Sequence, residues 1–127
     1  MKSKIVFLFL LCTLIGCSAS KTTTGSETVA DDYGYSEKNP IKVGGVDSGP
    51  ANERKYLDRL TGPNGEKVTY LRRGSCCNFE TKNSPFGGGL LDTYEVTIAG
   101  DPVKKILYLN MYDKDKLFAP KGFLMKN

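Results

Sequence analysis

The chain has 127 residues, with 18 basic and 14 acidic side chains, a formal net charge of +4 and no histidine. This small positive excess does not indicate a nucleic-acid-binding protein, and the lack of histidine removes the commonest general base of enzymes. A chain of this length has room for one modest hydrophobic core, so we expect a single domain. Composition therefore favours neither catalysis nor nucleic-acid binding.

The first seventeen residues, MKSKIVFLFLLCTLIGC, have the layout of a secretory signal. Lys2 and Lys4 precede an apolar run over residues 5–15 that only Thr13 interrupts. In a helix, such a run would span about 16 Å, roughly half of the hydrocarbon core of a bilayer. The run is too short to cross a membrane stably, so we predict a signal peptide over residues 1–16.

The segment Leu14-Ile15-Gly16-Cys17 resembles the lipobox of bacterial lipoproteins, because a small residue and then a cysteine directly follow the apolar run. The resemblance implies that the Cys17 thiol receives a diacylglyceryl group and that cleavage makes Cys17 the first residue. Two long acyl chains would hold the protein on a membrane with on the order of 20 kcal/mol. The expected partner of this end is therefore a lipid bilayer. Cleavage by an ordinary signal peptidase near Ala19 is the alternative.

Residues 17–32 are predicted to form the lipidated cysteine and a flexible tether. Serine and threonine are frequent there, and Val29 is the only large aliphatic residue, so burial cannot offset the ordering entropy. In lipoproteins the residue after the cysteine directs sorting, and Ser18 fits the outer-membrane pattern. We therefore predict a lipid-anchored protein of the cell envelope, on the outer membrane and facing the periplasm.

Residues 33–125 are predicted to form one α+β domain, which begins with an aromatic segment and a short edge strand. Tyr33 and Tyr35 could offer a surface for stacking sugars or binding partners, but an aromatic lid over the domain edge is the commoner outcome. After a turn at Asn39-Pro40, apolar Ile41 and Val43 alternate with other residues, as in an edge strand.

One helix is predicted over residues 48–62. Pro50 fits its first turn and Gly62 ends it. Tyr56, Leu57 and Leu60 form one apolar stripe at helical spacing. The charged residues are expected to face solvent; these are Glu53, Arg54, Lys55, Asp58 and Arg59.

Alternating hydrophobicity predicts a small antiparallel sheet of four to five strands, with the helix packed on one face. The strands expected after the helix cover residues 67–73, 76–81, 90–100 and 103–112, with a turn at Gly74-Ser75 and a flexible loop over 83–89. Tyr94, Val96 and Ile98 should share one face. Residues 106–109 are apolar on both faces, as in a central strand. Residues 116–123 are expected to add a last short strand.

Cys76 and Cys77 are the only cysteines expected in the folded domain, because Cys12 leaves with the signal peptide and Cys17 is acylated. In an oxidising compartment they can pair only with each other within the chain. Neighbours on an extended strand point to opposite faces, however. We therefore favour two buried structural thiols over a vicinal disulfide that acts as a rigid turn or redox switch. Metal binding is a third alternative, although zinc would need carboxylates to complete its ligand set.

Two further pairs of charged residues are candidate sites. Arg72 and Arg73, beside Gly74, are candidates for binding a phosphate or carboxylate, although exposure at a strand end explains them as well. Asp113 and Asp115 resemble the start of a calcium loop, but the other ligands of such a loop are missing, so we expect a polar turn. We predict no catalytic residue, no cofactor and no bound metal.

Four blocks of the sequence resemble a family of small lipoproteins of unknown function from Bacteroidetes-type bacteria. They are YGYSEKNPIKVGG, GPANERKYLDRLTGPNGEKVTYLRRGSCCNF, GLLDTYEVTIAG and LYLNMYDKDKLFAPKGF. Some members carry the name of 2-dehydro-3-deoxyphosphooctonate aldolase, but that enzyme is a barrel of eight strand–helix units, which needs about 250 residues. We expect instead a non-enzymatic module that binds an envelope protein or glycan. A redox or metal-linked role of Cys76 and Cys77 is the alternative.

Overall fold

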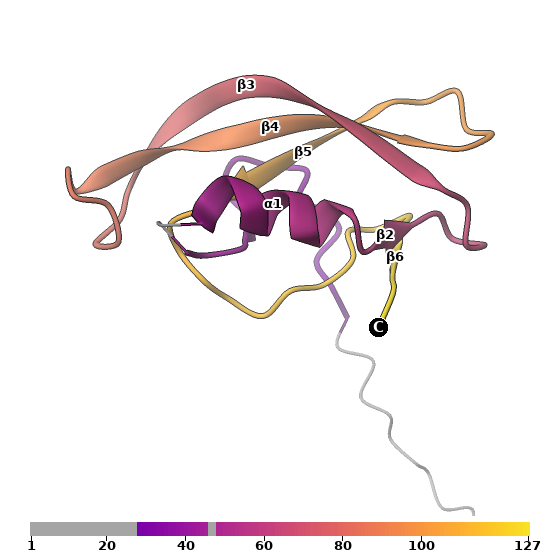
Figure 1. Ribbon diagram of the computed structural model, residues 1–127, viewed down its shortest axis with the longest axis horizontal. Coiled ribbons are helices and arrows are strands. Elements are labelled where there is room, and N and C mark those ends of the chain that lie inside the picture. The colour runs from indigo at the N-terminus through magenta and orange to yellow at the C-terminus, as the bar shows by residue number, and fades with distance from the viewer. Residues whose placement is uncertain (1–27, 46–47) are drawn as a thin grey trace, which may run out of the picture.

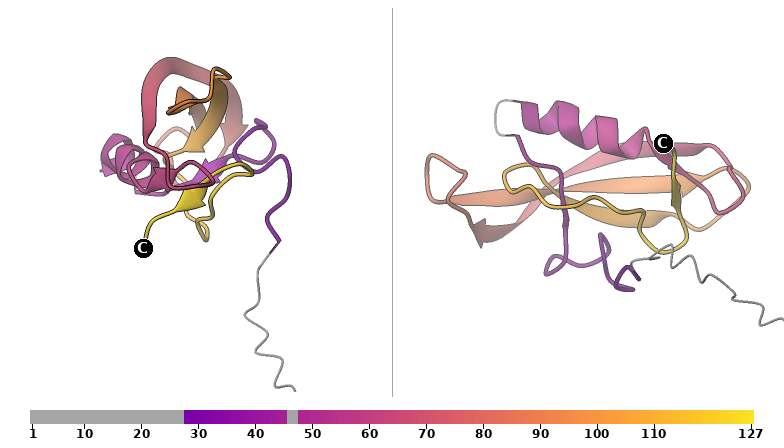
Figure 2. Two further views of the ribbon diagram at one scale, coloured as in Figure 1. Left: turned by 90° about the vertical axis from the view of Figure 1, so that its right-hand side faces the viewer. Right: turned by 90° about the horizontal axis from the view of Figure 1, so that it is seen from below.

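A computed structural model of the protein describes residues 28–45 and 48–127. Its main sheet has four strands in the order β1-β5-β4-β3, and a second sheet has two. Figure 1 shows α1, the one α-helix of these described residues, along one side of the main sheet, and Figure 2 shows it running in nearly the direction of the long strands. The predicted signal peptide, Cys17 and residues 18–27 lie outside the described residues. The elements are β1 (Ile41–Lys42), α1 (Gly49–Leu57), β2 (Leu60–Thr61), β3 (Val68–Glu80), β4 (Gly88–Ile98), β5 (Lys105–Asn110) and β6 (Leu124–Met125).

The described part of the chain has the predicted α+β character, with little helix. The main sheet is mixed, however, because β1 pairs in parallel with β5 through Ile41 opposite Leu109. The pairs β3–β4 and β4–β5 are antiparallel, in agreement with the predicted direction of the sheet. A two-residue strand takes its direction from the tertiary path of the chain, which hydropathy does not record, and the prediction of an entirely antiparallel sheet was wrong for this reason.

Strand β3 is one continuous strand of 13 residues where two strands and a turn were predicted. Its register with β4 shifts once between Arg72 and Gly74 and again between Cys76 and Asn78. The residues of β3 without a partner on β4 are Arg73 and Cys77. Cys77 has a φ of 63°, a left-handed conformation that occurs in β-bulges, and Gly74, which follows Arg73, has a φ of 141° that glycine adopts readily. The bulges bend β3 without ending it, and the strand is strongly curved in Figure 1.

One hydrophobic core joins α1, β1, β4 and β5. The predicted alternation in β4 is confirmed, since Tyr94, Val96 and Ile98 are all buried in this core. Strand β5 was expected to be buried on both faces, but Ile106 is 40% exposed while Leu107 is completely buried, so only one face is covered. The core residues are Tyr33, Ile41, Val43, Tyr56, Leu57, Leu60, Tyr94, Val96, Ile98, Leu107, Leu109 and Phe123.

Both ends of the described chain differ from the prediction. Residues 28–32, assigned to the tether, belong to the folded part, because Val29 packs against the core and the Tyr33 N–H donates to the Ala30 carbonyl at 3.0 Å. The last strand is β6 rather than 116–123. It pairs with β2, so α1 ends at Leu57 instead of reaching Gly62. In residues 28–45 and 48–127, no helix is long and apolar enough to cross a membrane.

Candidate functional site

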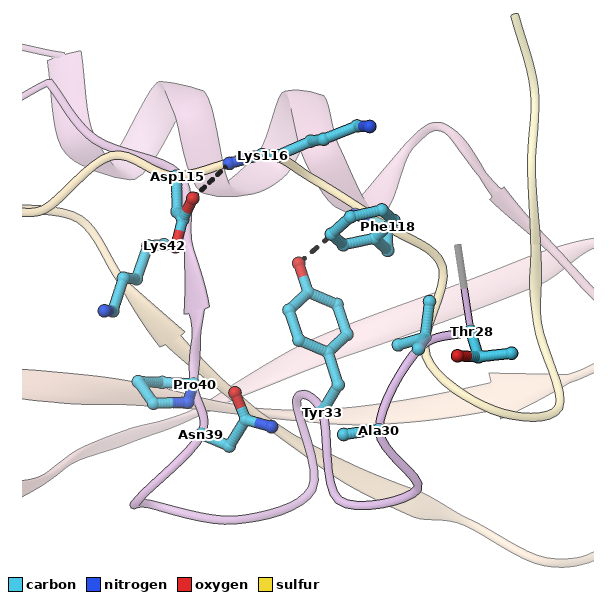
Figure 3. A pocket seen from close by; sticks show the side chains of 10 residues that line it. Thr28, Ala30, Tyr33, Asn39, Pro40, Lys42, Asp115, Lys116 and Phe118 are labelled. Atoms are coloured by element: carbon cyan, nitrogen blue, oxygen red, sulfur yellow. Dashed lines mark hydrogen bonds between the residues drawn. The ribbon is translucent and has the colours of Figure 1, made fainter. Parts of the chain in front are cut away.

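A pocket of about 240 Å³ lies where the N-terminal segment, β1 and residues 115–118 meet (Figure 3). Its floor is formed by Tyr33 and Phe118, whose ring centroids are 5.8 Å apart in an edge-to-face arrangement. We call it the Tyr33 pocket. Its lining residues are Thr28, Val29, Ala30, Tyr33, Asn39, Pro40, Lys42, Asp115, Lys116 and Phe118.

Hydrogen bonds hold the floor of the Tyr33 pocket in place. The backbone N–H of Phe118 donates to the Tyr33 hydroxyl at 3.3 Å, and the Tyr56 hydroxyl donates to the Phe118 carbonyl at 2.6 Å. Burial raises the pKa of both tyrosine hydroxyls. The floor is therefore a fixed aromatic surface that stays neutral at physiological pH.

The rim of the Tyr33 pocket carries charges of both signs. Lys42 extends from β1, while Asp115 and Lys116 follow β5. The Asp115 carboxylate accepts a 2.8 Å hydrogen bond from the Lys116 backbone N–H, and the Lys116 ammonium lies 5.4 Å from the centre of the Phe118 ring (Figure 3). An aromatic floor with ammonium and carboxylate groups around it suits a ligand with an apolar face and a polar or anionic edge. Asp115 supplies the carboxylate of this lining, and Lys42 and Lys116 supply its two ammonium groups.

Tyr33 and Tyr35, which the sequence analysis considered as one stacking surface, make different contacts in the structure. Tyr33 is 9% exposed and packs on Phe118, whereas the Tyr35 hydroxyl donates to the Lys121 carbonyl at 2.5 Å. Their rings therefore do not form a shared stacking surface. The lining residues Lys42 and Phe118 were missed, because no short-range pattern shows that residues 42 and 118 share a pocket.

Arg72 and Arg73 do not form a joint anion site. Arg72 makes a bidentate contact with Asp92, at 3.0 and 3.3 Å, while Arg73 lies 3.6 Å from Glu95. Asp92 and Glu95 are three positions apart on β4 and so lie on opposite faces of the sheet. Each guanidinium therefore pairs with a different carboxylate, and Glu95 also pairs with Lys104 at 2.9 Å. The geometry gives no support to the binding of a sugar phosphate between the two arginines.

The structure also shows a buried polar contact at Glu53, a residue that we predicted to face solvent. Glu53 has no exposed surface, and its Oε2 accepts a 2.9 Å hydrogen bond from the Tyr94 hydroxyl. Burial raises the pKa of Glu53 to about 8, and the nearby negative charge of Asp92 acts in the same direction. The expectation of a solvated Glu53 was wrong. Glu53 lies three residues before Tyr56 and four before Leu57, which places it on the same face of the helix as these apolar residues. The sequence therefore contained a signal that Glu53 is buried.

The sulfur atoms of Cys76 and Cys77 are joined in a vicinal disulfide. Cys77 is the extra residue of the second bulge, and both side chains are half-buried at the surface of β3 rather than part of the core. The favoured interpretation of two buried thiols does not fit this arrangement. That interpretation assumed that neighbouring side chains on a strand point to opposite faces. The left-handed conformation of Cys77 breaks this alternation.

Asp113 belongs to a polar turn, and Asp115 belongs to the Tyr33 pocket. The Asp113 carboxylate accepts hydrogen bonds from the side chains of Thr81, Asn83 and Asn110, which tie the 81–87 loop to the end of β5. Within the described ranges, no group of three or more acidic or cysteine side chains is placed to hold a metal ion.

Comparison with known proteins gives no relative for this fold or site. Family models, curated proteins and solved structures all yield no match to the chain.

Proposed function

We propose that this protein is a lipid-anchored bacterial envelope protein with a small, non-enzymatic binding domain. The observation that carries the proposal is the segment Leu14-Ile15-Gly16-Cys17 directly behind an apolar run. Thr28, the first described residue, follows Cys17 by eleven positions, a stretch that spans at most about 38 Å. A lipid on Cys17 would thus keep the Tyr33 pocket near the membrane surface. Ser18 favours the outer membrane, with the domain facing the periplasm.

The anchor is tested by growing cells with a clickable palmitate analogue and separating membrane from soluble fractions. The wild type should take up the label and sediment with membranes, whereas Cys17→Ala should carry no label. Cys12→Ala is the matched control, because it removes a cysteine that leaves with the signal peptide, and it should label normally. An unlabelled wild type, or a labelled Cys17→Ala protein, would refute the lipoprotein assignment.

We infer further that α1 covers the inner face of the main sheet and that this unit carries the binding site. The Glu53–Tyr94 hydrogen bond supports this packing, as do Tyr56 and Leu57, which share a hydrophobic cluster with Val96. The unit positions β1 and the Tyr33 pocket at the edge of the sheet. The ligand class that best suits the pocket is an envelope glycan, because its ring could rest on Phe118 while the rim groups bond its hydroxyls. A side chain of an envelope protein is the alternative.

Ligand binding is tested by saturation-transfer NMR with soluble fragments of envelope glycans and, in parallel, with envelope-derived peptides. Lys42→Ala removes a rim ammonium and should weaken binding by about tenfold, the size of one charge-assisted hydrogen bond. Lys38→Ala is the matched control, since Lys38 is exposed and does not line the pocket. Equal binding by both variants would remove the pocket from the proposal without affecting the lipid anchor.

A further inference from the structure

The disulfide of Cys76 and Cys77 lies where β3 changes its register with β4. Among the described residues, Cys77 is the only non-glycine residue with a positive φ. This left-handed conformation costs an L-residue roughly 1–2 kcal/mol, and in an ordinary strand Cys77 would point away from Cys76. The covalent bond requires the two side chains to converge. We attribute the second bulge of β3 to this constraint.

The second bulge determines which residues of β3 and β4 are opposite each other beyond Cys77. In the disulfide form, Asn78 is opposite Leu90 and Phe79 is opposite Gly89. The Tyr112 ring lies against Gly89, since a Cβ there would come within 2.6 Å of Tyr112 Cε2. Phe79 thus meets Tyr112 edge-to-face, with ring centroids 5.8 Å apart. This aromatic pair depends on the register that the bulge sets.

Loss of the bulge would move residues 78–80 by one position relative to β4. Asn78 would then be opposite Gly89, and Phe79 would turn to the other face of the sheet, because side chains alternate along a strand. The proximal part of β3 is held by the Arg72–Asp92 ion pair and by the hydrogen bond from Tyr70 to Asp58. The 81–87 loop can take up the extra residue. The change would therefore be confined to residues 78–90, which we call the distal hairpin.

We propose that Cys76 and Cys77 form a thiol–disulfide exchange site whose redox state sets the register of the distal β3–β4 hairpin. Both cysteines are half-buried at the surface of β3, so a dithiol can reach the part that solvent touches. The dithiol is the reductant, either a small molecule or a protein of the envelope. This site lies outside the Tyr33 pocket, and the proposal is independent of the ligand bound there.

The exchange is balanced in atoms and electrons. A thiolate of the dithiol attacks one sulfur of the pair, a mixed disulfide forms, and the other cysteine leaves as a thiolate that takes up a proton. The second thiol of the dithiol then attacks the mixed disulfide and releases the first cysteine as a thiol. Two electrons and two protons thus pass from the dithiol to the pair, and the dithiol becomes a disulfide.

The redox state can be read from one tryptic peptide, GSCCNFETK, which holds both cysteines and no other. The protein is incubated with dithiothreitol at millimolar concentration, quenched and alkylated, while circular dichroism monitors the fold. We expect two alkyl groups on this peptide while the protein remains folded. A pair that stays oxidised until the protein unfolds would overturn the proposal.

The register change is measured by amide hydrogen exchange on the oxidised and reduced wild type. Exchange in residues 78–90 should be at least about fivefold faster in the reduced form, while residues 94–98 should be unchanged. Identical exchange in both forms would also overturn the proposal.

Two variants separate the disulfide from the bulge. Cys76→Ser combined with Cys77→Ser should exchange like the reduced wild type, with or without dithiothreitol. Cys76→Ser combined with Cys77→Gly should exchange like the oxidised form, because glycine accepts a positive φ without a disulfide. Identical exchange patterns in the two double variants would show that the conformation of residue 77 does not control the register.

Discussion

The Tyr94 hydroxyl on β4 donates a 2.9 Å hydrogen bond to the carboxyl group of Glu53 on α1, inside the core of the protein. Glu53 is completely buried and Tyr94 is 3% exposed. A charged carboxylate is costly to bury without a cation in direct contact, and burial accordingly raises the pKa of Glu53 to about 8. At neutral pH the helix is thus linked to the sheet by a protonated carboxylic acid.

The first prediction is a pH dependence of stability that originates at Glu53. The pKa of Glu53 is about 8 in the folded protein and about 4.5 in the unfolded chain. Between these values the folded state binds more protons, so the free energy of unfolding should decrease as pH rises, by on the order of 1 kcal/mol per pH unit. Glu53→Gln should abolish most of this decrease. The measurement is urea unfolding at several pH values from 5 to 8.

Glu37→Gln is the control for this experiment, because Glu37 is exposed. This variant should keep the pH dependence of the wild type. The interpretation of Glu53 as a buried neutral acid is wrong if the wild type shows the same stability at pH 5 and pH 8.

The second prediction concerns the buried carboxylate of Asp92. Asp92 is 2% exposed and accepts hydrogen bonds from Arg72 and from the Ser75 hydroxyl, the latter at 2.8 Å. Asp92→Asn should lower the free energy of unfolding at pH 7 by about 1–2 kcal/mol, less than for a fully buried pair, because water reaches the half-exposed Arg72. Chemical denaturation of both proteins at pH 7 measures the loss.

The same pair of proteins gives a second, independent measurement. Burial alone would raise the pKa of Asp92, but hydrogen bonds from Arg72 and Ser75 outweigh it and hold the pKa below its usual range. The stabilising contribution is therefore present above about pH 4, the pKa of the unfolded chain, and lost as pH falls through the lowered pKa. The difference between wild type and Asp92→Asn should shrink in acid. Asp31→Asn, which breaks the exposed ion pair with Lys121, should change little at any pH.

The third prediction tests the contact of Gly89 with Tyr112. A Cβ at position 89 would lie within 2.6 Å of the Tyr112 ring, so Gly89→Ala should lower stability by about 1–3 kcal/mol through overpacking. Tyr112→Leu in the same chain should restore part of this loss, because it removes the ring atoms that the methyl group meets. A double-mutant cycle on thermal unfolding measures the coupling, and a coupling of zero would contradict the contact.

The fourth prediction is that one large apolar side chain contributes nothing to folding. Phe86 in the 81–87 loop is 94% exposed. Phe86→Ser should change the free energy of unfolding by less than about 0.5 kcal/mol, as is usual for exposed positions. Phe123→Ser is the comparison, because Phe123 is 5% exposed and belongs to the core, so it should be strongly destabilising. A large loss for Phe86→Ser would show that this loop packs on another part of the chain.

Strong periodicity made part of the fold predictable from the sequence. The alternation of Tyr94, Val96 and Ile98 gave strand β4 and its buried face, and Pro50 with Tyr56 and Leu57 gave the position of α1. These signals depend on residues close together in the chain. They do not show which strands are neighbours, and the parallel pairing of Ile41 with Leu109 was missed for this reason.

The candidate site was less predictable, because it depends on contacts between distant segments. Lys42, Asp115 and Phe118 form one pocket only after β1 has paired with β5. At Cys76 and Cys77, strand alternation was a sound guide to an ordinary strand, but a covalent bond between neighbouring side chains overrides it. At Glu53 the helical spacing pointed to the core, whereas the charge of the side chain pointed to solvent; protonation resolves the conflict.

The pairing of β1 with β5, and of β2 with β6, has a consequence for the order in which the chain folds. Ile41 meets Leu109, and Leu60 meets Met125, so each pairing joins an early residue to a late one. A chain that is synthesised from its N-terminus cannot complete the main sheet before Leu109, or the two-stranded sheet before Met125, has left the ribosome. Both sheets are therefore completed late in synthesis, and the partly made chain lacks these two pairings until then.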